Sequence, residues 1–358
     1  MSSLPGSKPT DSKPKLTGVA ADGYPLSPVQ QGMLFHWLLD QHSGTDIEQI
    51  VGDLHEPMDP SRFAAAWQAA VDHFSILRTT FAWEGLATPL QAIETVARLE
   101  FTVHDLRADS ASARERRVRE FLRSDRHAGV DLTCAPAMRV TLFRIEDARF
   151  RMVWTFHHIL LDGRAFEVIL NDVFATYAGA RTHIQADSPY REFIEWTARQ
   201  DTAASRAFWR ARLAGFRQPI PLPAAAWGAS AVEGFVPNDL SMSLESSQRL
   251  RELADREGLS LNTLVLGAWA LLLSQHSAMT DIVFGATKTT RRGSIPGAES
   301  MVGMFLATIP VRIRVEPSMT VSAWLRRVRT DWVALHGHEH LPLVDIQAVS
   351  EEIGRAHV

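Results

Sequence analysis

The segment Arg149–Tyr177 constrains the fold of this chain most, because a strand, a polar motif and a helix follow one another directly. Within Arg149–Phe156 every second position is apolar, a period of two that is typical of a half-buried strand. The motif His157-His158-x-x-x-Asp162-Gly163 comes next, and Arg164–Tyr177 has the apolar spacing of an amphipathic helix. The sequence therefore predicts a strand–turn–helix unit with titratable side chains at the turn.

The two adjacent histidines are expected to face opposite ways. If the strand reaches His158, that side chain lies on the apolar face and His157 points to the other side, away from the interior. An inward-facing imidazole at a strand end is suited to acid–base chemistry near neutral pH. Two other interpretations stay open, namely a core histidine bonded to a backbone carbonyl and a metal ligand. No further ligand lies at a convincing zinc spacing, and we interpret the cluster His336–His340 as structural or surface.

Five further segments resemble, in order and spacing, motifs of one enzyme family. They are Leu26–His36, Ile76–Phe81, Tyr190–Trp196, Val302–Thr308 and His340–Leu343. Together with HHxxxDG, they resemble the condensation domains of nonribosomal peptide synthetases, within the chloramphenicol-acetyltransferase-like superfamily. The resemblance covers about residues 23–352. Phe74 (unless His73 substitutes), Ala307 and Arg164 replace a usual histidine, asparagine and tryptophan, which puts substrate selection in doubt.

The resemblance implies an α/β fold (α+β, two-layer) with two chloramphenicol-acetyltransferase-like lobes and an active site in a channel between them. We expect a flexible N-terminal arm at 1–21, an N-terminal lobe at 22–180 and a C-terminal lobe at 181–352. The family's seventh motif is missing, so the C-terminal lobe is expected to be incomplete and the chain truncated. Residues 353–358 look like the translation of a sequencing adapter, and we interpret them as a non-native tail.

The secondary structure expected around these motifs follows from the same periodicities and from turn and cap residues. Strands are expected at 77–83, 99–104, 138–145, 149–158, 281–286 and 307–315. Helices are expected from Pro28 onward and at 61–73, 110–126, 164–177, 190–213, 246–257, 260–274 and 322–335.

The function implied by the resemblance is amide (peptide) bond formation. A donor acyl or peptidyl thioester would react with an acceptor aminoacyl thioester, both on the 4'-phosphopantetheine arms of carrier domains. His158 would be the catalytic residue, as general base or as an acceptor that orients the amine. His157 and Asp162 would be structural, with Arg291 as the cation facing Asp162, and Gly163 would allow a tight turn or a close substrate.

Two kinds of alternative stay open beside this function. One is another enzyme of the same superfamily, either a standalone acyltransferase that uses a free amine or alcohol or an epimerisation domain. The other is a non-catalytic module that recruits partner enzymes. The identity of donor and acceptor lies beyond the sequence.

Composition limits the partners and the compartment. A net charge of −4 and the lack of a basic run with interleaved aromatics argue against nucleic acid. Cys134 is the only cysteine, so an internal disulfide is impossible. The longest apolar stretch, Leu264–Leu273, is too short to cross a membrane, so we expect a cytoplasmic protein. The expected partners are upstream and downstream carrier domains and an adenylation domain, with no metal or bound cofactor.

Overall fold

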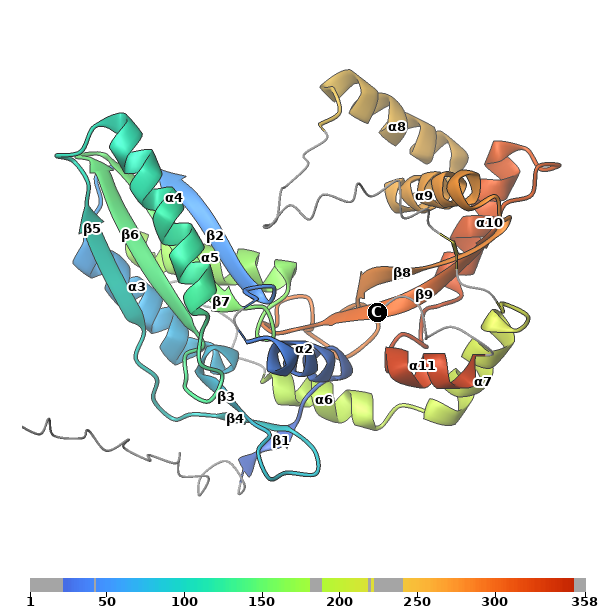
Figure 1. Cartoon of the computed structure of the whole chain (residues 1–358), viewed down its shortest axis with the longest axis horizontal. Coiled ribbons are helices and arrows are strands. Elements are labelled where there is room, and N and C mark those ends of the chain that lie inside the picture. Colours follow the sequence, from blue (N-terminus) through green and yellow to red (C-terminus); the bar gives the residue numbers. More distant parts are fainter. Residues whose placement is uncertain (1–21, 42, 181–188, 218–219, 222–240, 351–358) are drawn as a thin grey trace, which may run out of the picture. The chain divides into compact units, whose positions relative to one another are not determined.

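The computed structural model describes residues 22–41, 43–180, 189–217, 220–221 and 241–350 (Figure 1). The chain divides into two compact units. The first ends at Glu195 and also takes in the later segment Pro296–Met304. The second consists of Trp196–Ile295 and the chain from Phe305 onward. The expected arm at 1–21 and tail at 353–358 lie outside the described residues.

A four-stranded sheet forms the centre of the first unit. Its order is β2-β7-β6-β5, and β7 pairs antiparallel with both β2 and β6, whereas β5 and β6 are parallel. The strands are β2 (Ile47–Leu54), β5 (Glu100–Asp105), β6 (Met138–Glu146) and β7 (Arg149–His157). The strand that precedes the histidine motif is therefore a central strand with a neighbour on each edge.

Helices cover both faces of this sheet. The ring of Trp154 on β7 lies 5.0 Å from Trp67 of α3 and 6.1 Å from Phe166 of α5. On the opposite face, the Thr155 hydroxyl donates to the Asp125 carboxylate of α4 at 2.6 Å. The helices are α3 (Pro60–His73), α4 (Ala111–Ala128) and α5 (Gly163–Ala178). Every residue from Met152 to His157 is consequently buried, so the expectation of a half-buried strand is wrong.

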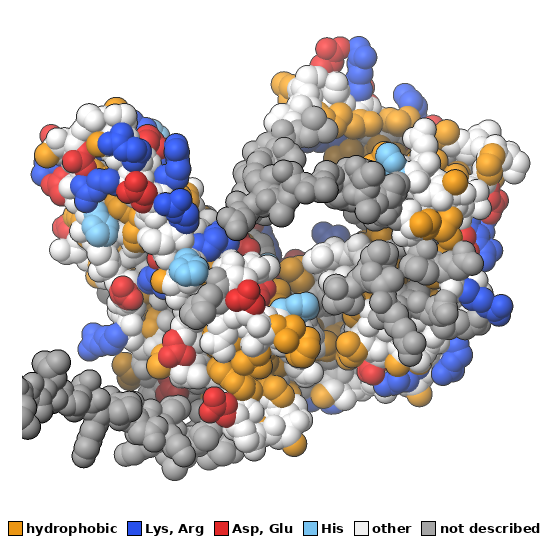
Figure 2. Space-filling view, viewed as in Figure 1, with side chains coloured by type: hydrophobic (Ala, Val, Ile, Leu, Met, Phe, Trp, Pro, Cys, Tyr) orange, Lys and Arg blue, Asp and Glu red, His pale blue; other side chains and the backbone are white. Residues whose placement is uncertain are grey.

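Charged side chains gather over α4, where Figure 2 shows basic and acidic groups intermixed. Only Val118 and Asp125 of this helix are buried, as its charged sequence predicts.

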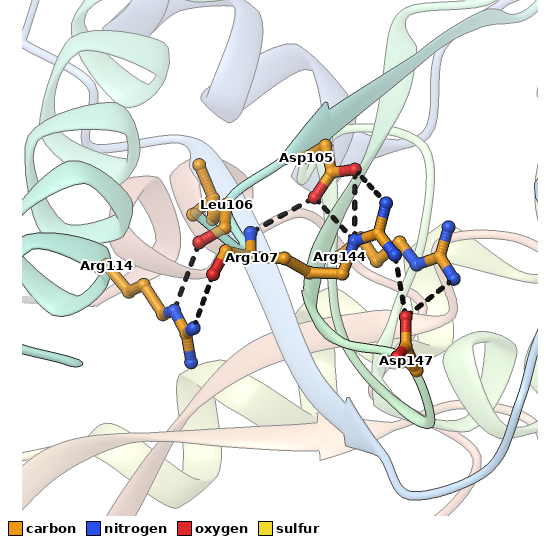
Figure 3. A network of polar contacts seen from close by, with 6 residues as sticks. All are labelled: Asp105, Leu106, Arg107, Arg114, Arg144 and Asp147. Atoms are coloured by element: carbon orange, nitrogen blue, oxygen red, sulfur yellow. Dashed lines mark hydrogen bonds and ion pairs between the residues drawn. The ribbon is translucent and has the colours of Figure 1, made fainter. Parts of the chain in front are cut away.

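At the far end of the sheet, a guanidinium links two elements (Figure 3): Arg107 bonds Asp105 at 2.7 Å and Asp147 at 2.6 Å. The link ties the end of β5 to the turn between β6 and β7 and holds the pKa of the exposed Asp105 down at about 2.

A three-stranded sheet of order β1-β4-β3 completes the first unit beside helix α2. Its strands are β1 (Tyr24–Pro25), β3 (Thr79–Ala82) and β4 (Leu90–Ile93), and the helix is α2 (Pro28–Leu39). Ser27 and Gln30 form a capping box at the start of α2, and Pro28 occupies the first turn of the helix. The strand expected at 77–83 begins only at Thr79, because Ser75–Arg78 forms a 3₁₀ turn.

The second unit contains a two-stranded antiparallel sheet with helices packed around a common core. Core residues from three helices and a strand meet at Trp209, Leu266, Ile309 and Trp324. The strands are β8 (Asp281–Thr289) and β9 (Leu306–Arg314). The helices are α7 (Thr202–Leu213), α8 (Leu244–Glu257), α9 (Leu261–Ser277), α10 (Val321–Val333) and α11 (Leu343–Val349).

One expected helix, over 190–213, is divided into α6 (Tyr190–Ala198) and α7. The break occurs because the Asp201 carboxylate accepts the Ala204 N–H at 3.0 Å, which begins a new helix. Within the described ranges, no single helix is long and apolar enough to cross a membrane, and only α8 with α9 reach that length and composition together, across a bend of 102°.

Candidate functional site

His157 is the last residue of β7 and is completely buried. Its Nδ1 accepts the N–H of Ile159 at 3.1 Å, so the ring proton is on Nε2. That Nε2 is buried and has no hydrogen-bond partner among the described residues. Burial, and then the charge of His158, lowers the pKa of His157 to about 3. His157 is therefore neutral at physiological pH and has no lone pair directed at a substrate.

His158 lies just beyond the strand and is partly exposed. Its backbone N–H donates to the Asp46 carbonyl at 2.8 Å, and its Nδ1 lies 2.8 Å from the carbonyl of Leu161. A carbonyl can only accept, so Nδ1 carries the proton when the ring is neutral. Nε2 then keeps its lone pair, which makes His158 the histidine of the pair that can receive a proton.

Strand β7 ends one residue earlier than expected, but the His158 side chain lies on the expected face of the sheet. Phe166 lies 5.1 Å from Phe156 and 6.5 Å from His158, so α5 borders both rings. The expectation that His157 points away from the interior is wrong. The opposite face of β7 is also covered, and the Trp37 ring of α2 meets His157 edge-on at 6.2 Å.

Asp162 caps the helix that follows the turn. Its Oδ1 accepts the N–H of Ala165 at 2.9 Å, and its own N–H donates to the Gly303 carbonyl at 3.2 Å. The side chain is 1% exposed. A buried carboxylate at a helix N-terminus is stabilised by the helix dipole and satisfies a free N–H group. The interpretation that Asp162 braces the turn agrees with these contacts.

Gly163 is exposed, and its φ lies outside the left-handed region. A Cβ added there would meet nothing within 4 Å. The turn itself consequently does not require glycine, and the close approach of a substrate at Gly163 stays a prediction.

Arg291 lies in the second unit, just after β8, and is 3% exposed. Its guanidinium carbon is 4.2 Å from the centre of the Phe305 ring, which gives the buried cation a π face. Asp162 belongs to the first unit, so the pairing of Asp162 with Arg291 stays a prediction.

Sequence reasoning missed the side chain of Gln30, which is hydrogen-bonded to the turn that follows the two histidines. Gln30, which lies in the segment Leu26–His36 and is completely buried, donates through Nε2 to the Ile159 carbonyl at 3.1 Å. Gln91 fixes this amide, because its Nε2 donates to the Gln30 Oε1 at 2.9 Å. The polar Gln30 in an otherwise apolar helix stripe was the available signal. Asp46, next to His158, was missed because strand β2 after it was not identified.

No group of three or more His, Cys, Asp or Glu side chains in the described residues could hold a metal ion. The histidines at 336–340 have other contacts. The Ser205 hydroxyl lies 3.0 Å from His338 Nδ1 and 3.1 Å from His340 Nε2, and the His338 ring stacks on Phe208 at 4.0 Å. These contacts support the structural interpretation of the cluster.

Comparison with known proteins identifies the family of this chain. The family model "Condensation domain" matches residues 20–356, and the chain therefore belongs to the condensation domain family, whose members in nonribosomal peptide synthetases form peptide bonds. The resemblance found in the sequence is confirmed. The condensation domains of these synthetases catalyse an acyltransferase-type reaction.

Among its relatives are two large synthetases. It is 39% identical over 338 residues to a component of the linear gramicidin synthase of Brevibacillus parabrevis, matching 92% of this chain and 4% of that protein. It is 38% identical over 312 residues to chondramide synthase cmdD of Chondromyces crocatus, matching 86% of this chain and 8% of that protein. The chain thus spans a small fraction of the curated relatives that it matches.

The fold is shared with solved condensation domains. The first condensation domain of the CDA synthetase superposes with a TM-score of 0.76 at 19% identity, covering 95% of this chain and 79% of that one. The expected α/β fold of two lobes is confirmed, whereas the channel between the lobes stays a prediction.

Proposed function

We propose that this chain joins a donor acyl or peptidyl thioester to an acceptor aminoacyl thioester, and that His158 is the catalytic residue. The observation that carries the proposal is the Nδ1 contact of His158 with the Leu161 carbonyl at 2.8 Å. When the ring is neutral, this contact places the proton on Nδ1, so the Nε2 lone pair can receive a proton from the acceptor amine.

The reaction needs one proton transfer to His158 Nε2. The acceptor amine attacks the thioester carbonyl carbon, a C–N bond forms, and the carbonyl π electrons move to oxygen. The nitrogen, now positive, gives its proton to His158 Nε2. The intermediate then collapses, the C–S bond breaks, and the leaving thiolate takes up a proton, so that an amide and a free thiol result. Holding the two thioesters in place accounts for several kcal/mol of the barrier, roughly 7–11 in the best cases.

The other motif residues support His158 without touching the reacting atoms. His157 holds the turn through the Ile159 N–H, and Asp162 holds it through Ala165 and Gly303. We propose that Gly163 leaves room for a substrate, in keeping with the open space at its Cβ position. We also propose that Arg291 is the cation that faces Asp162.

The partners proposed are the carrier domains that bring both thioesters on phosphopantetheine arms and an adenylation domain that loads the acceptor. The small share of each synthetase that the chain matches supports partners on other segments or proteins. No metal or bound cofactor takes part in this scheme, and the cytoplasmic location stays a prediction.

His158→Ala is expected to fold like the parent and to lose most condensation, by about a factor of 10²–10⁴, which is typical for a general base. His157→Ala is the matched variant, and it should mainly lower soluble yield. The measurement is dipeptidyl-carrier formation followed by intact-protein mass spectrometry. Full activity of the His158 variant would exclude this assignment. Equal use of a free amine and a carrier-bound one would favour a standalone acyltransferase.

A further inference from the structure

Asp46 lies directly opposite His158 at the end of the β2–β7 pair. Ile47 is the partner of His157 in the antiparallel register, and one more bond, from the His158 N–H to the Asp46 carbonyl at 2.8 Å, continues the pairing. Residues opposite one another in an antiparallel pair project from the same face, with Cβ atoms about 4.5–5.5 Å apart. The Asp46 carboxyl group therefore lies on the same side as the His158 imidazole.

The surroundings of Asp46 include charges from four elements. Burial raises the pKa of its carboxyl group, the charges of His36 on α2 and His158 lower it, and Glu48 of β2 raises it. The Arg126 guanidinium of α4 donates to the carbonyl groups of Gly44 and Ile47. Among the described residues, the Asp46 carboxylate forms no hydrogen bond or ion pair. A partly buried carboxylate near two histidines thus has all its acceptor positions open.

We propose that Asp46 is a positioning residue that draws the acceptor's amine to His158, an inference that rests on the proposed condensation reaction. The acceptor nitrogen is positive twice: as the arriving ammonium, which gives one proton to solvent water before it attacks, and again when the C–N bond has formed. A carboxylate on the His158 side stabilises both charges. Asp46 itself forms no bond and takes no proton, because the proton of the attacking nitrogen goes to His158 Nε2.

A purely structural role for Asp46 makes a different prediction. Its backbone carbonyl already holds the His158 N–H, and this bond is independent of the side chain. If the carboxylate only stabilised the turn, its removal would lower the thermal stability and leave the affinity for the acceptor unchanged. The proposal instead requires a change in acceptor KM and in the pH profile.

The test uses the full chain with N-acetylaminoacyl carriers as donors and carriers loaded with the standard amino acids as acceptors, continuing with the pair of highest yield. Asp46→Asn removes the charge at constant size, and Asp46→Glu keeps it. Glu56→Gln is the control, because Glu56 is an exposed carboxylate that lies just after the end of the same strand. Steady-state rates are measured against acceptor and donor concentration from acid to neutral pH.

We expect Asp46→Asn to lower kcat/KM for the acceptor about tenfold, mainly through KM, because a neighbouring charge shifts such equilibria by about one unit or more. The acid limb of the pH profile should also change, because Asp46→Asn removes a negative charge beside the reacting groups. The donor KM should not change. Asp46→Glu should recover most of the loss, and Glu56→Gln should stay within about twofold of the parent, because screening weakens the effect of a distant surface charge.

An active parent and an Asp46→Asn variant with the same acceptor KM and the same acid limb would overturn the role of Asp46 and leave the proposed function intact. A parent that condenses none of the pairs would instead count against the proposed function. Asp46→Ser, with another turn-forming residue, is the second neutral variant. If neither neutral variant folds, Asp46 acts in folding and the inference fails.

Discussion

Gly303→Ala should destabilise the first unit strongly, because the new methyl group has no room. Its Cβ would lie 2.4 Å from Cδ2 of Tyr190 and 3.0 Å from Cε2 and Cγ of that ring. The ring is 1% exposed, and its hydroxyl donates to the Met304 carbonyl at 2.5 Å. Neither the ring nor the backbone can therefore move without losing a contact.

The expected cost follows from two terms. Overpacking of this kind costs about 1–3 kcal/mol. Displacing residue 303 also weakens the bond from the Asp162 N–H to its carbonyl, which is worth about 0.5–1.5 kcal/mol. The free energy of unfolding should fall by about 2–4 kcal/mol, a large part of a typical total of about 5–15.

Urea unfolding followed by far-ultraviolet circular dichroism measures this change. Gly163→Ala is the control, since the same methyl group meets nothing within 4 Å there and the backbone has an ordinary φ. It should leave the midpoint unchanged or raise it slightly, because alanine favours a helix over glycine by up to about 1 kcal/mol. Equal midpoints for Gly303→Ala and the parent would refute the packing argument. Loss of condensation in a stable Gly163→Ala variant would support the close passage of a substrate.

Three further predictions concern His157 and Asp162. The parent should lose stability by about 1.4 kcal/mol per pH unit as the pH falls below about 6.5, because His157 takes up a proton when unfolded but only near pH 3 when folded. The His157→Ala variant should lack this contribution to the slope. Parallel curves of stability against pH for the parent and the variant would contradict a buried, neutral His157 ring. Asp162→Ala should cost about 1 kcal/mol through the lost cap, and Asp162→Asn, which can still cap, should cost less. If Asp162 also pairs with Arg291, a double-mutant cycle of Asp162→Ala and Arg291→Ala should show coupling in the free energy of unfolding, and strictly additive effects would mean that the two side chains are not partners.

The sequence predicted the motif-bearing elements well because local rules determine them. The period of two gave β7 to within one residue, and the side chains of Ser110 and Asp162 fix the starts of α4 and α5 through single hydrogen bonds. Such signals need no knowledge of the rest of the chain. The roles of the site residues, in contrast, stay predictions until the variants are measured.

The wrong predictions concern features that depend on contacts with distant parts of the chain. Strand β2 was not identified because Glu48, Gln49 and Asp53 interrupt its apolar pattern, and its pairing with β7 holds it in place. The burial of His157 was mistaken for exposure because helices from elsewhere cover both faces of the sheet. Asp46 could not be identified from the sequence, because only the pairing of β2 with β7 places it opposite His158.

The segment Pro296–Met304 belongs to the first unit although the chain reaches it only after Trp196–Ile295. The acceptors for the Asp162 N–H and for the Tyr190 hydroxyl lie in it. On the ribosome, where N-terminal units usually fold first, this unit must wait for a segment synthesised much later. The same interleaving matters for chimeric enzymes: a recombination junction at Glu195 separates both donors from their native acceptors. An exchange that transplants Pro296–Met304 together with the N-terminal portion keeps them paired.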